Sequence, residues 1–208
     1  MEKTNTNRLY YFICYKPYQV LCQFSPEPGK LVLADVLPGL PKDVYPAGRL
    51  DYDSEGLLLL TNDGHFIKQL LEPRYKHKRT YLVQVEGNIT DEALAQLASG
   101  ITISVNGKKY TTLPAQAERC TTEPKLPPRN PPIRVRKLIP TSWIRLTLTE
   151  GKNRQVRKMT AATGFPTLRL VRYSIENITI EQLQPGECRL LHAHELSALS
   201  KIFSANKR

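Results

Sequence analysis

Apolar and polar residues alternate along much of the chain with the two-residue period of β-strands. We expect strands where this alternation coincides with β-branched and aromatic residues. The expected strands are Tyr10–Cys14, Val20–Phe24, Leu57–Thr61, Tyr81–Glu86, Ala115–Cys120, Ser142–Thr149, Thr167–Ser174 and Glu187–Leu191. Two further short runs, 101–105 and 108–112, flank Asn106-Gly107, a dipeptide typical of a type I′ hairpin turn.

Three segments carry the helical spacing of apolar residues instead, and each has a capping residue or a helix breaker at its ends. They are His65–Leu71, Asp91–Ala98 and Lys152–Thr163. Because strands outnumber helices and do not alternate regularly with them, the pattern predicts an α+β fold with a mixed, mostly antiparallel sheet. We expect one domain at 9–203, with room for two subdomains, between flexible termini at 1–8 and 204–208.

Composition narrows the class of protein. The chain has 208 residues, of which 40% are hydrophobic, and this fraction is too high for a disordered chain. No apolar run approaches the roughly 18 residues that a membrane span needs, and the N-terminus does not resemble a signal peptide. The four cysteines form no C-x-x-C pair. We therefore expect reduced thiols in a cytoplasmic protein that does not bind a membrane.

Positive charge is concentrated in one part of the chain. The formal net charge is +11, and the stretch 123–172 holds twelve Lys or Arg against two acids, which accounts for +10 of it. Contacts between cations and phosphates release counterions, so such a concentration favours a polyanionic partner. Prolines interrupt 124–140, which disfavours an amphipathic membrane helix. Nucleic acid is the favoured partner, ahead of an anionic membrane or an acidic protein.

An acidic loop precedes the apolar run Leu57–Leu60 and has several interpretations. Asp51, Asp53 and Glu55 resemble the start of an EF-hand, but position twelve would be Asn62, where a bidentate Glu is required. Clustered carboxylates on a basic protein also suit a two-metal nuclease. A solvated turn whose acids cap the following elements is the plainest alternative. The residues alone leave these alternatives open.

The string GRLDYDSEGLLLLTNDG at 48–64 resembles the signature of the RsuA/RluB/RluE/RluF group of rRNA pseudouridine synthases. Further motifs agree with that family in the correct order, so the resemblance spans about residues 10–192. These motifs are Tyr15–Val20, Thr80–Val83, Glu150–Met159, Leu168–Ile175 and Pro185–Glu187. The resemblance implies the pseudouridine synthase fold. The opening motif at Lys16 leaves no room for the S4 domain of several relatives, so we expect the catalytic domain to bind RNA by itself.

The resemblance also implies a reaction, the isomerisation of uridine on a base flipped out of its stack. Asp51 is the expected catalytic carboxylate, by attack on C1′ or through a glycal route. Tyr81 is expected to stack on the target base, and Arg157 to form a salt bridge that holds Asp51 ionised. RNA contacts are expected from Arg49, Lys16, Arg79, Arg129, Arg134, Arg136, Lys152, Arg154, Lys158, Arg169 and Arg172.

This reaction needs neither a redox step nor a Lewis acid, so we expect no cofactor and no metal. The expected substrate is one uridine of 23S rRNA, in the peptidyl-transferase region of domain V, and the expected state is a monomer. The alternative from another class is a noncatalytic RNA-binding or ribosome-assembly protein on the same fold. The sequence does not predict which uridine is modified, nor whether free rRNA or a ribosomal precursor is the substrate.

Overall fold

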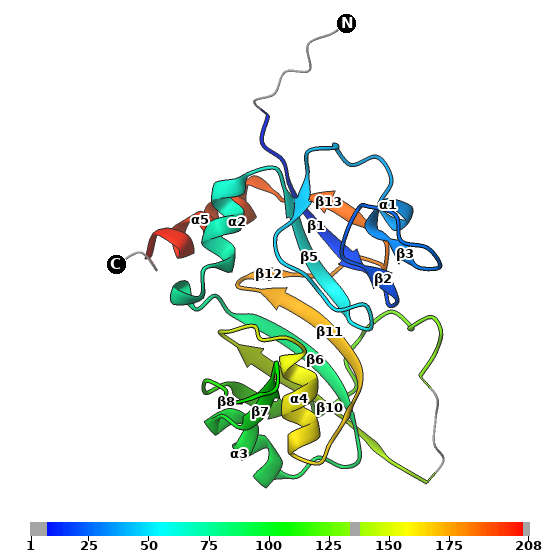
Figure 1. Ribbon diagram of the computed structural model, residues 1–208, viewed down its shortest axis with the longest axis vertical. Coiled ribbons are helices and arrows are strands. Elements are labelled where there is room, and N and C mark those ends of the chain that lie inside the picture. The colour runs from blue at the N-terminus through cyan, green and yellow to red at the C-terminus, as the bar shows by residue number, and fades with distance from the viewer. Residues whose placement is uncertain (1–7, 134–137, 206–208) are drawn as a thin grey trace, which may run out of the picture.

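The computed structural model describes residues 8–133 and 138–205, and these form one nine-stranded sheet that runs through the molecule (Figure 1). Its main path is β13 (Cys188–Leu190), β1 (Tyr11–Lys16), β5 (Glu55–Thr61), β11 (Thr167–Ile175), β6 (Arg79–Glu86), β10 (Thr141–Leu148) and β9 (Gln116–Arg119). Two short strands join its sides, β4 (Tyr45–Pro46) on β5 and β12 (Ile178–Thr179) on β11.

The centre of this sheet is its one parallel pair among the described strands. β5 runs parallel to β11, with Glu55 opposite Val171 and Gly56 opposite Arg172, and the other neighbours in the path are antiparallel. The expected α+β class with a mostly antiparallel sheet is therefore confirmed. The parallel pair divides the sheet into an N-terminal half around β1 and β5 and a second half around β6 and β10.

Strand register gives the two faces of the sheet different roles. Leu58, Arg172 and Tyr81 share one face, here called the front face, because Arg172 is paired with both Gly56 and Tyr81. On this face the N-terminal half packs against α1 (Leu33–Val36), and the second half packs against α3 (Asp91–Ser99) and α4 (Gln155–Ala162). These two front-face clusters are separate, and the space between them is where the candidate site lies.

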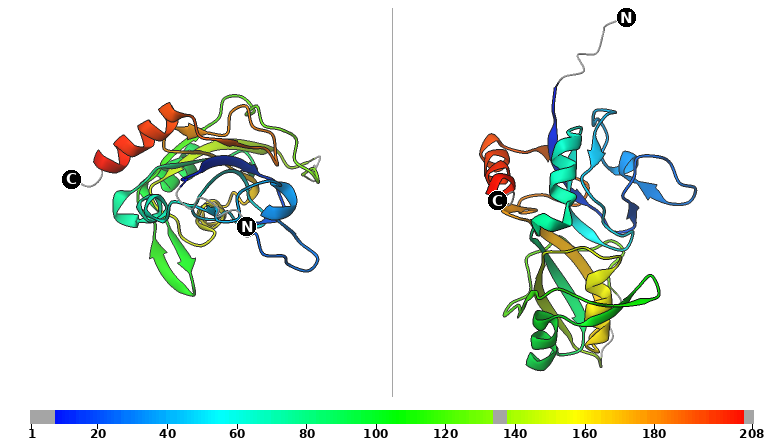
Figure 2. Two further views of the ribbon diagram at one scale, coloured as in Figure 1. Left: turned by 90° about the horizontal axis from the view of Figure 1, so that it is seen from above. Right: turned by 60° about the vertical axis from the view of Figure 1, so that its left-hand side comes forward.

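The opposite face is covered by α5 (Ala193–Ala205), which the sequence did not predict. Leu199 and Phe203 of this helix are buried in the cluster that also holds Leu57 and Val171. Figure 2 shows α5 on one side of the sheet, with α4 and the β7–β8 hairpin on the other. The helix includes residues 204 and 205, which lie past the expected end of the domain. No helix among the described residues has the length and apolarity to cross a membrane.

Local signals account for several other elements. The carboxylate of Asp63 accepts hydrogen bonds from the amides of His65 and Phe66, which caps α2 (Gly64–Leu71). The hairpin of β7 (Thr102–Val105) and β8 (Lys108–Thr111) is confirmed, and both of its turn residues have positive φ. The structure also contains the parallel pair β2 (Val20–Leu21) and β3 (Leu31–Val32) and a 3₁₀ turn, η1 (Pro73–Tyr75).

Two expectations about local structure are wrong. The strand expected at Val20–Phe24 is limited to its first two residues. Cys14 and Cys188 form a disulfide rather than two reduced thiols, because the register of β1 and β13 places them directly opposite each other. Cys22 and Cys120 are free thiols.

Gly56 is the position at which the central pair tolerates no side chain. Its φ is +108°, and a Cβ there would lie 2.4 Å from the carbonyl oxygen of Arg172 and 2.7 Å from its nitrogen. Both obstacles are backbone atoms of the neighbouring strand, which cannot rotate away as a side chain would. Glycine is therefore required both by the dihedral angle and by the closeness of β11.

We predict that Gly56→Ala lowers the free energy of unfolding by about 3 kcal/mol or more, since the left-handed dihedral and the steric overlap both oppose it. Urea denaturation measures the change. Gly29→Ala is the matched control, because Gly29 also has positive φ, at +74°, but a Cβ there meets nothing within 4 Å. Equal losses in the two variants would show that the contact with β11 contributes nothing.

Candidate active site

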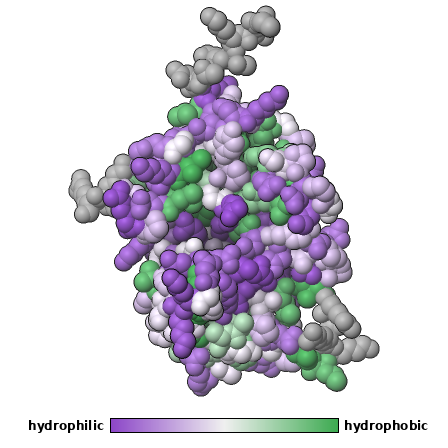
Figure 3. Space-filling model, in the orientation of Figure 1, coloured by the Kyte–Doolittle hydropathy of each residue, from purple (hydrophilic) through white to green (hydrophobic). Residues whose placement is uncertain are grey.

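A cavity of about 610 Å³ lies between the two front-face clusters, a volume suited to a small ligand or an extruded nucleotide. Figure 3 shows hydrophilic side chains around the hollow at this level of the molecule. Most of its charged and aromatic lining comes from five parts of the chain: the loop before β5, the end of α2, β6, β11 and the turn before α4. The residues concerned are Arg49, Asp51, Tyr52, Glu72, Arg79, Tyr81, Glu150, Lys152, Arg154 and Arg172.

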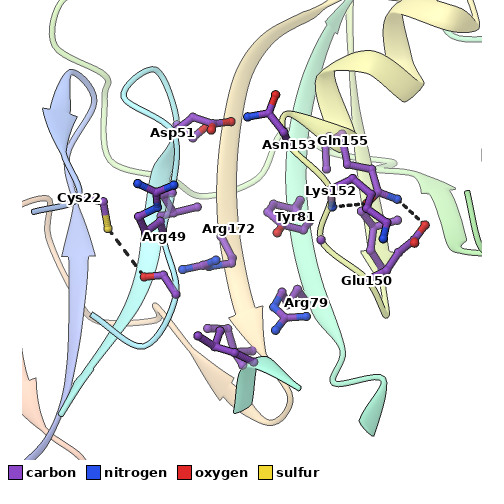
Figure 4. A pocket seen from close by; sticks show the side chains of 18 of the residues that line it. Cys22, Arg49, Asp51, Arg79, Tyr81, Glu150, Lys152, Asn153, Gln155 and Arg172 are labelled. Carbon is purple, nitrogen blue, oxygen red and sulfur yellow. Dashed lines mark hydrogen bonds between the residues drawn. The ribbon is translucent and has the colours of Figure 1, made fainter. Parts of the chain in front are cut away.

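Asp51 sits on the loop that connects β4 to β5, at the upper end of the cavity in Figure 4. The loop is held at several points. The amide of Ser54 donates to the carbonyl oxygen of Asp51 at 3.1 Å, and the amide of Gln19 donates to that of Tyr52 at 2.9 Å. The loop then enters β5, which is buried throughout. A partly exposed carboxylate is thus presented from a rigid support.

Asp53, rather than Asp51, is the carboxylate that binds both Arg154, just before α4, and Arg157, in its first turn. Arg154 donates to both oxygens of Asp53, at 2.9 and 2.8 Å, and lies 3.9 Å from the Oδ2 atom of Asp51. The Nε atom of Arg157 lies 3.3 Å from Asp53 Oδ2, and its Nη2 atom donates to the Asp53 carbonyl oxygen. The expected salt bridge between Arg157 and Asp51 is therefore wrong.

The reason for this correction is the local backbone. The expected helix began at Lys152, but Arg154 is in the left-handed region, with φ 52°, and α4 begins only at Gln155. Arg154 is thereby turned toward the acidic loop, and it takes the position between the two aspartates. Arg157 lies in the first turn of α4 and reaches Asp53.

The two ion pairs lower the pKa of Asp53. Burial alone would raise its pKa, but the hydrogen bonds from Arg154 and the charges of Arg157 and Arg154 outweigh burial and hold the pKa below its usual value. The hydrogen bond to Asp53 in turn raises the pKa of Arg154. These pairs join the Asp51 loop of the N-terminal half to α4 of the second half.

A second polar cluster, centred on Glu150, holds the turn before α4 from the side of the β7–β8 hairpin. Glu150 accepts hydrogen bonds from the side-chain amide of Gln155 at 2.7 Å, from the amide of Leu113 at 2.8 Å and from the hydroxyl of Tyr110. The ammonium group of Lys152 lies 4.8 Å from the centre of the Tyr110 ring. This cluster ties the β7–β8 hairpin to the start of α4.

Tyr81 faces the cavity from β6 and lies between Arg172 on β11 and Leu146 on β10 in the register. Its ring also packs partly against the cluster of the second half. In Figure 4 it lies across the cavity from the loop that carries Asp51. The expectation that Asp51 and Tyr81 share a site came only from the family resemblance. In the structure both residues line the same cavity.

The structure separates the residues expected to contact RNA into two groups. Arg49, Arg79, Lys152, Arg154 and Arg172 line the cavity, whereas Lys16, Arg129, Lys158 and Arg169 do not. Arg134 and Arg136 lie outside the described residues.

Lys16 and Arg169 do not line the cavity and are bonded to groups of the protein, which favours a structural role over the expected RNA contact. The Nζ atom of Lys16 donates to the carbonyl oxygens of Pro17 and Val20, at 2.8 and 2.7 Å, and burial lowers its pKa to about 8. Arg169 forms a bidentate pair with Glu55, at 2.9 and 2.8 Å, and donates to a carbonyl of the proline-rich stretch. Both side chains stabilise the fold.

Two other expected RNA contacts lie outside the cavity with local partners. The guanidinium of Arg129 lies 4.2 Å from the centre of the Tyr18 ring. Lys158 is within 3.5 Å of the side-chain oxygen of Asn153. Among the described residues, no three His, Cys, Asp or Glu side chains are grouped to hold a metal ion.

A partly exposed carboxylate and a strand tyrosine thus line one cavity among several arginines, an arrangement that suits an enzyme acting on a nucleic acid. Residues 10–162 match the family model described as RNA pseudouridylate synthase, and the chain belongs to this family. The family resemblance of the sequence is thereby confirmed, and with it an isomerase that acts on RNA.

Individual relatives are also pseudouridine synthases by name. The chain is 52% identical over 172 residues to ribosomal large subunit pseudouridine synthase E of Vibrio vulnificus, covering 83% of this chain and 70% of the relative. It is 36% identical over 197 residues to ribosomal large subunit pseudouridine synthase B of Bacillus subtilis, covering 95% and 74%. A crystal structure of a pseudouridylate synthase superimposes with a TM-score of 0.74 at 28% identity, over 96% of this chain and 76% of that one.

Asp53 is the site residue that sequence reasoning missed, since the D-x-D pattern suggested only metal binding or a turn.

We predict that Asp53→Asn lowers kcat about tenfold with little change in KM, because it removes the charge that Arg154 and Arg157 both contact and so loosens the Asp51 loop. Steady-state kinetics on the RNA substrate measure both constants. Asp91→Asn, which removes an exposed ion pair to Arg119, is the control. A kcat within twofold of that control would contradict the positioning role.

Proposed function

We propose that this protein converts one uridine of 23S rRNA, in domain V, to pseudouridine, with Asp51 as the catalytic carboxylate. The observation that carries the proposal is the pair formed by Asp51 and Tyr81, which face one cavity from the two halves of the sheet among cationic side chains. The relatives named as large subunit synthases support the choice of RNA.

The reaction needs the target nucleotide outside its helix, because C1′ and the glycosidic bond are not accessible in a stack. Asp51 either attacks C1′ or removes a ribose proton to give a glycal. In the first route the N1–C1′ bond breaks as the carboxylate bonds to C1′, and C5 of the rotated uracil then displaces the carboxylate. In the second route the N1–C1′ bond breaks as the ribose proton is removed, and the ribose regains that proton when C5 bonds to C1′. In both routes the proton on C5 moves to solvent as N1 gains one, so the proposed isomerisation needs no co-reactant.

The surrounding residues have distinct proposed roles. Tyr81 stacks on the uracil while it rotates, and Arg154, which lies 3.9 Å from Asp51, orients the carboxylate. Arg49 either displaces the base from its stack or holds the adjacent backbone. Lys152 is placed to contact phosphates at the rim. Arg157 acts through Asp53, as a positioning residue. The protein is proposed to work as a cytoplasmic monomer.

A noncatalytic RNA-binding or ribosome-assembly protein on the same fold is the rival function. Such a protein would need the basic surface but would have no use for a carboxylate held at the cavity. The arrangement of Asp51, Tyr81 and the Arg154–Asp53 pair therefore favours the enzyme.

We predict that Asp51→Ala abolishes pseudouridine formation while RNA binding persists, because the variant removes the reacting group and leaves the cations. Purified variant and wild type are incubated with 23S rRNA that lacks the modification, and pseudouridine is mapped by carbodiimide labelling and mass spectrometry. Equal pseudouridine content in the two reactions would overturn the catalytic assignment and favour the noncatalytic rival.

Two controls sharpen this experiment. Asp91→Asn carries a charge change at an exposed ion pair and should retain the activity of the wild type. Treatment with EDTA should leave the activity intact, provided that the RNA is kept folded by monovalent salt. Loss of activity with EDTA and its recovery with a divalent cation would support the two-metal alternative instead.

A further inference from the structure

The lower part of the cavity holds more positive charge than its carboxylates balance. Arg49, Arg172 and Arg79 lie in a diagonal row below Asp51 in Figure 4. Within the described ranges, none of the three forms an ion pair with a carboxylate. Arg154 and Lys152, by contrast, have Asp53 and the Tyr110 ring as partners. The row is thus a group of cations that no described carboxylate contacts directly.

Arg172 is the most unusual member of the row. Its exposure is 4%, and its Nε atom donates to the carbonyl oxygen of Leu57 at 2.7 Å. Its Nη2 atom is buried and has no hydrogen-bond acceptor among the described residues. A buried guanidinium nitrogen without an acceptor carries a desolvation cost that is largest for charged groups. This cost is removed when a ligand supplies an oxygen.

Arg79 places a second cation in the same part of the cavity. It extends from β6 two residues before Tyr81, on the same face of the sheet, and its described hydrogen bonds go to the backbone carbonyls of His77 and Leu70. Burial and the charge of Arg172 lower its pKa more than the charges of Tyr81 and Glu176 raise it, so the two guanidiniums repel each other. An anion between them would relieve both the repulsion and the missing acceptor.

We propose that Arg172 and Arg79 form an anion subsite that binds one phosphodiester group of the RNA next to the target uridine. The assignment of the anion to RNA rests on the proposed function, whereas the subsite itself rests on the geometry. A phosphate fits better than a uracil carbonyl, because its charge neutralises the two guanidiniums and its several oxygens reach both. The subsite lies in the same cavity as Asp51 and Tyr81, so it holds the backbone while the base reacts.

The subsite is tested first without RNA, with inorganic phosphate as the probe. Phosphate should raise the melting temperature of the wild type relative to chloride at equal ionic strength, because a ligand that binds only the native state stabilises it. Arg172→Gln should lose this shift. Arg145→Gln is the matched control, since Arg145 pairs with Leu82 in the register and so points to the opposite face, where it forms an exposed ion pair with Glu118.

Arg172→Lys guards against a folding defect. The ammonium group of the lysine can replace the hydrogen bond to the Leu57 carbonyl. It has a single nitrogen, however, so it cannot bond to that carbonyl and also take the position of Nη2 toward a phosphate. It should therefore keep the melting temperature of the wild type in chloride and show a reduced shift with phosphate. A full phosphate shift in both Arg172 variants would overturn the subsite.

Nucleoside probes separate a phosphate contact from a base contact. Uridine 5′-monophosphate should stabilise the wild type more than uridine does, and Arg172→Gln should remove only the difference. Equal stabilisation by uridine and its monophosphate would overturn the phosphate assignment in favour of a uracil contact. On RNA, Arg172→Gln should raise KM about tenfold, the range expected for a lost charge-assisted hydrogen bond, with a smaller effect on kcat.

Failure of the anion subsite and failure of the proposed function give different results. If Asp51→Ala leaves the pseudouridine content unchanged but phosphate still stabilises the wild type through Arg172, the anion subsite stands and the catalytic assignment falls. If Asp51→Ala abolishes the reaction but phosphate acts equally on wild type and both Arg172 variants, the catalytic assignment stands and the subsite falls.

Discussion

The two halves of the sheet are joined by a close backbone contact between β5 and β11 at Gly56. A Cβ on Gly56 would overlap the backbone of Arg172, so a side chain at that position would push the two strands apart. The pair joins the two halves of the sheet, and it sets where the loop of Asp51 stands relative to Tyr81 on the next strand. The cavity is the gap that remains on the front face because each half packs its own cluster. The carboxylate of Asp51, proposed as the catalytic group, and the ring of Tyr81 thus come from separate halves that meet along one backbone contact.

Ion pairs on both faces of the sheet stabilise the contact between its two halves. On the front face, Asp53 binds Arg154 and Arg157 and connects the Asp51 loop to α4. On the other face, Glu55 binds Arg169, which also holds the proline-rich stretch through a carbonyl oxygen. Both acids belong to the same short segment as Asp51. Part of the positive charge concentrated at 123–172 therefore forms ion pairs inside the protein that hold the segment carrying Asp51, and only the remainder is available for RNA.

Local patterns predicted most of the sheet, because alternation and turn chemistry are encoded over a few residues. The hairpin at Asn106-Gly107 and the cap at Asp63 are examples. Residue roles that depend on strand register were harder to predict from the sequence. Arg169 and Arg172 are three residues apart on one strand and so face opposite sides, which no count of charges reveals. The exchange of Arg157 for Arg154 depends on one left-handed residue, and the disulfide of Cys14 depends on a pairing with a strand 174 residues away. Asp51 and Tyr81 were found through the order of the family motifs.

The charge balance of the cavity indicates how binding and chemistry are divided. Uracil is neutral, so it cannot balance the row of Arg49, Arg172 and Arg79, whereas the RNA backbone can. Binding energy from parts of a substrate that do not react can be used to hold the reacting part in a strained or extruded position. An arrangement with cations at one end of the cavity and Asp51 at the other suits this use, because in the proposed reaction the backbone is bound where no bond changes. The proposed reaction then leaves the base free to detach and rotate over Tyr81, because the binding energy comes from the backbone.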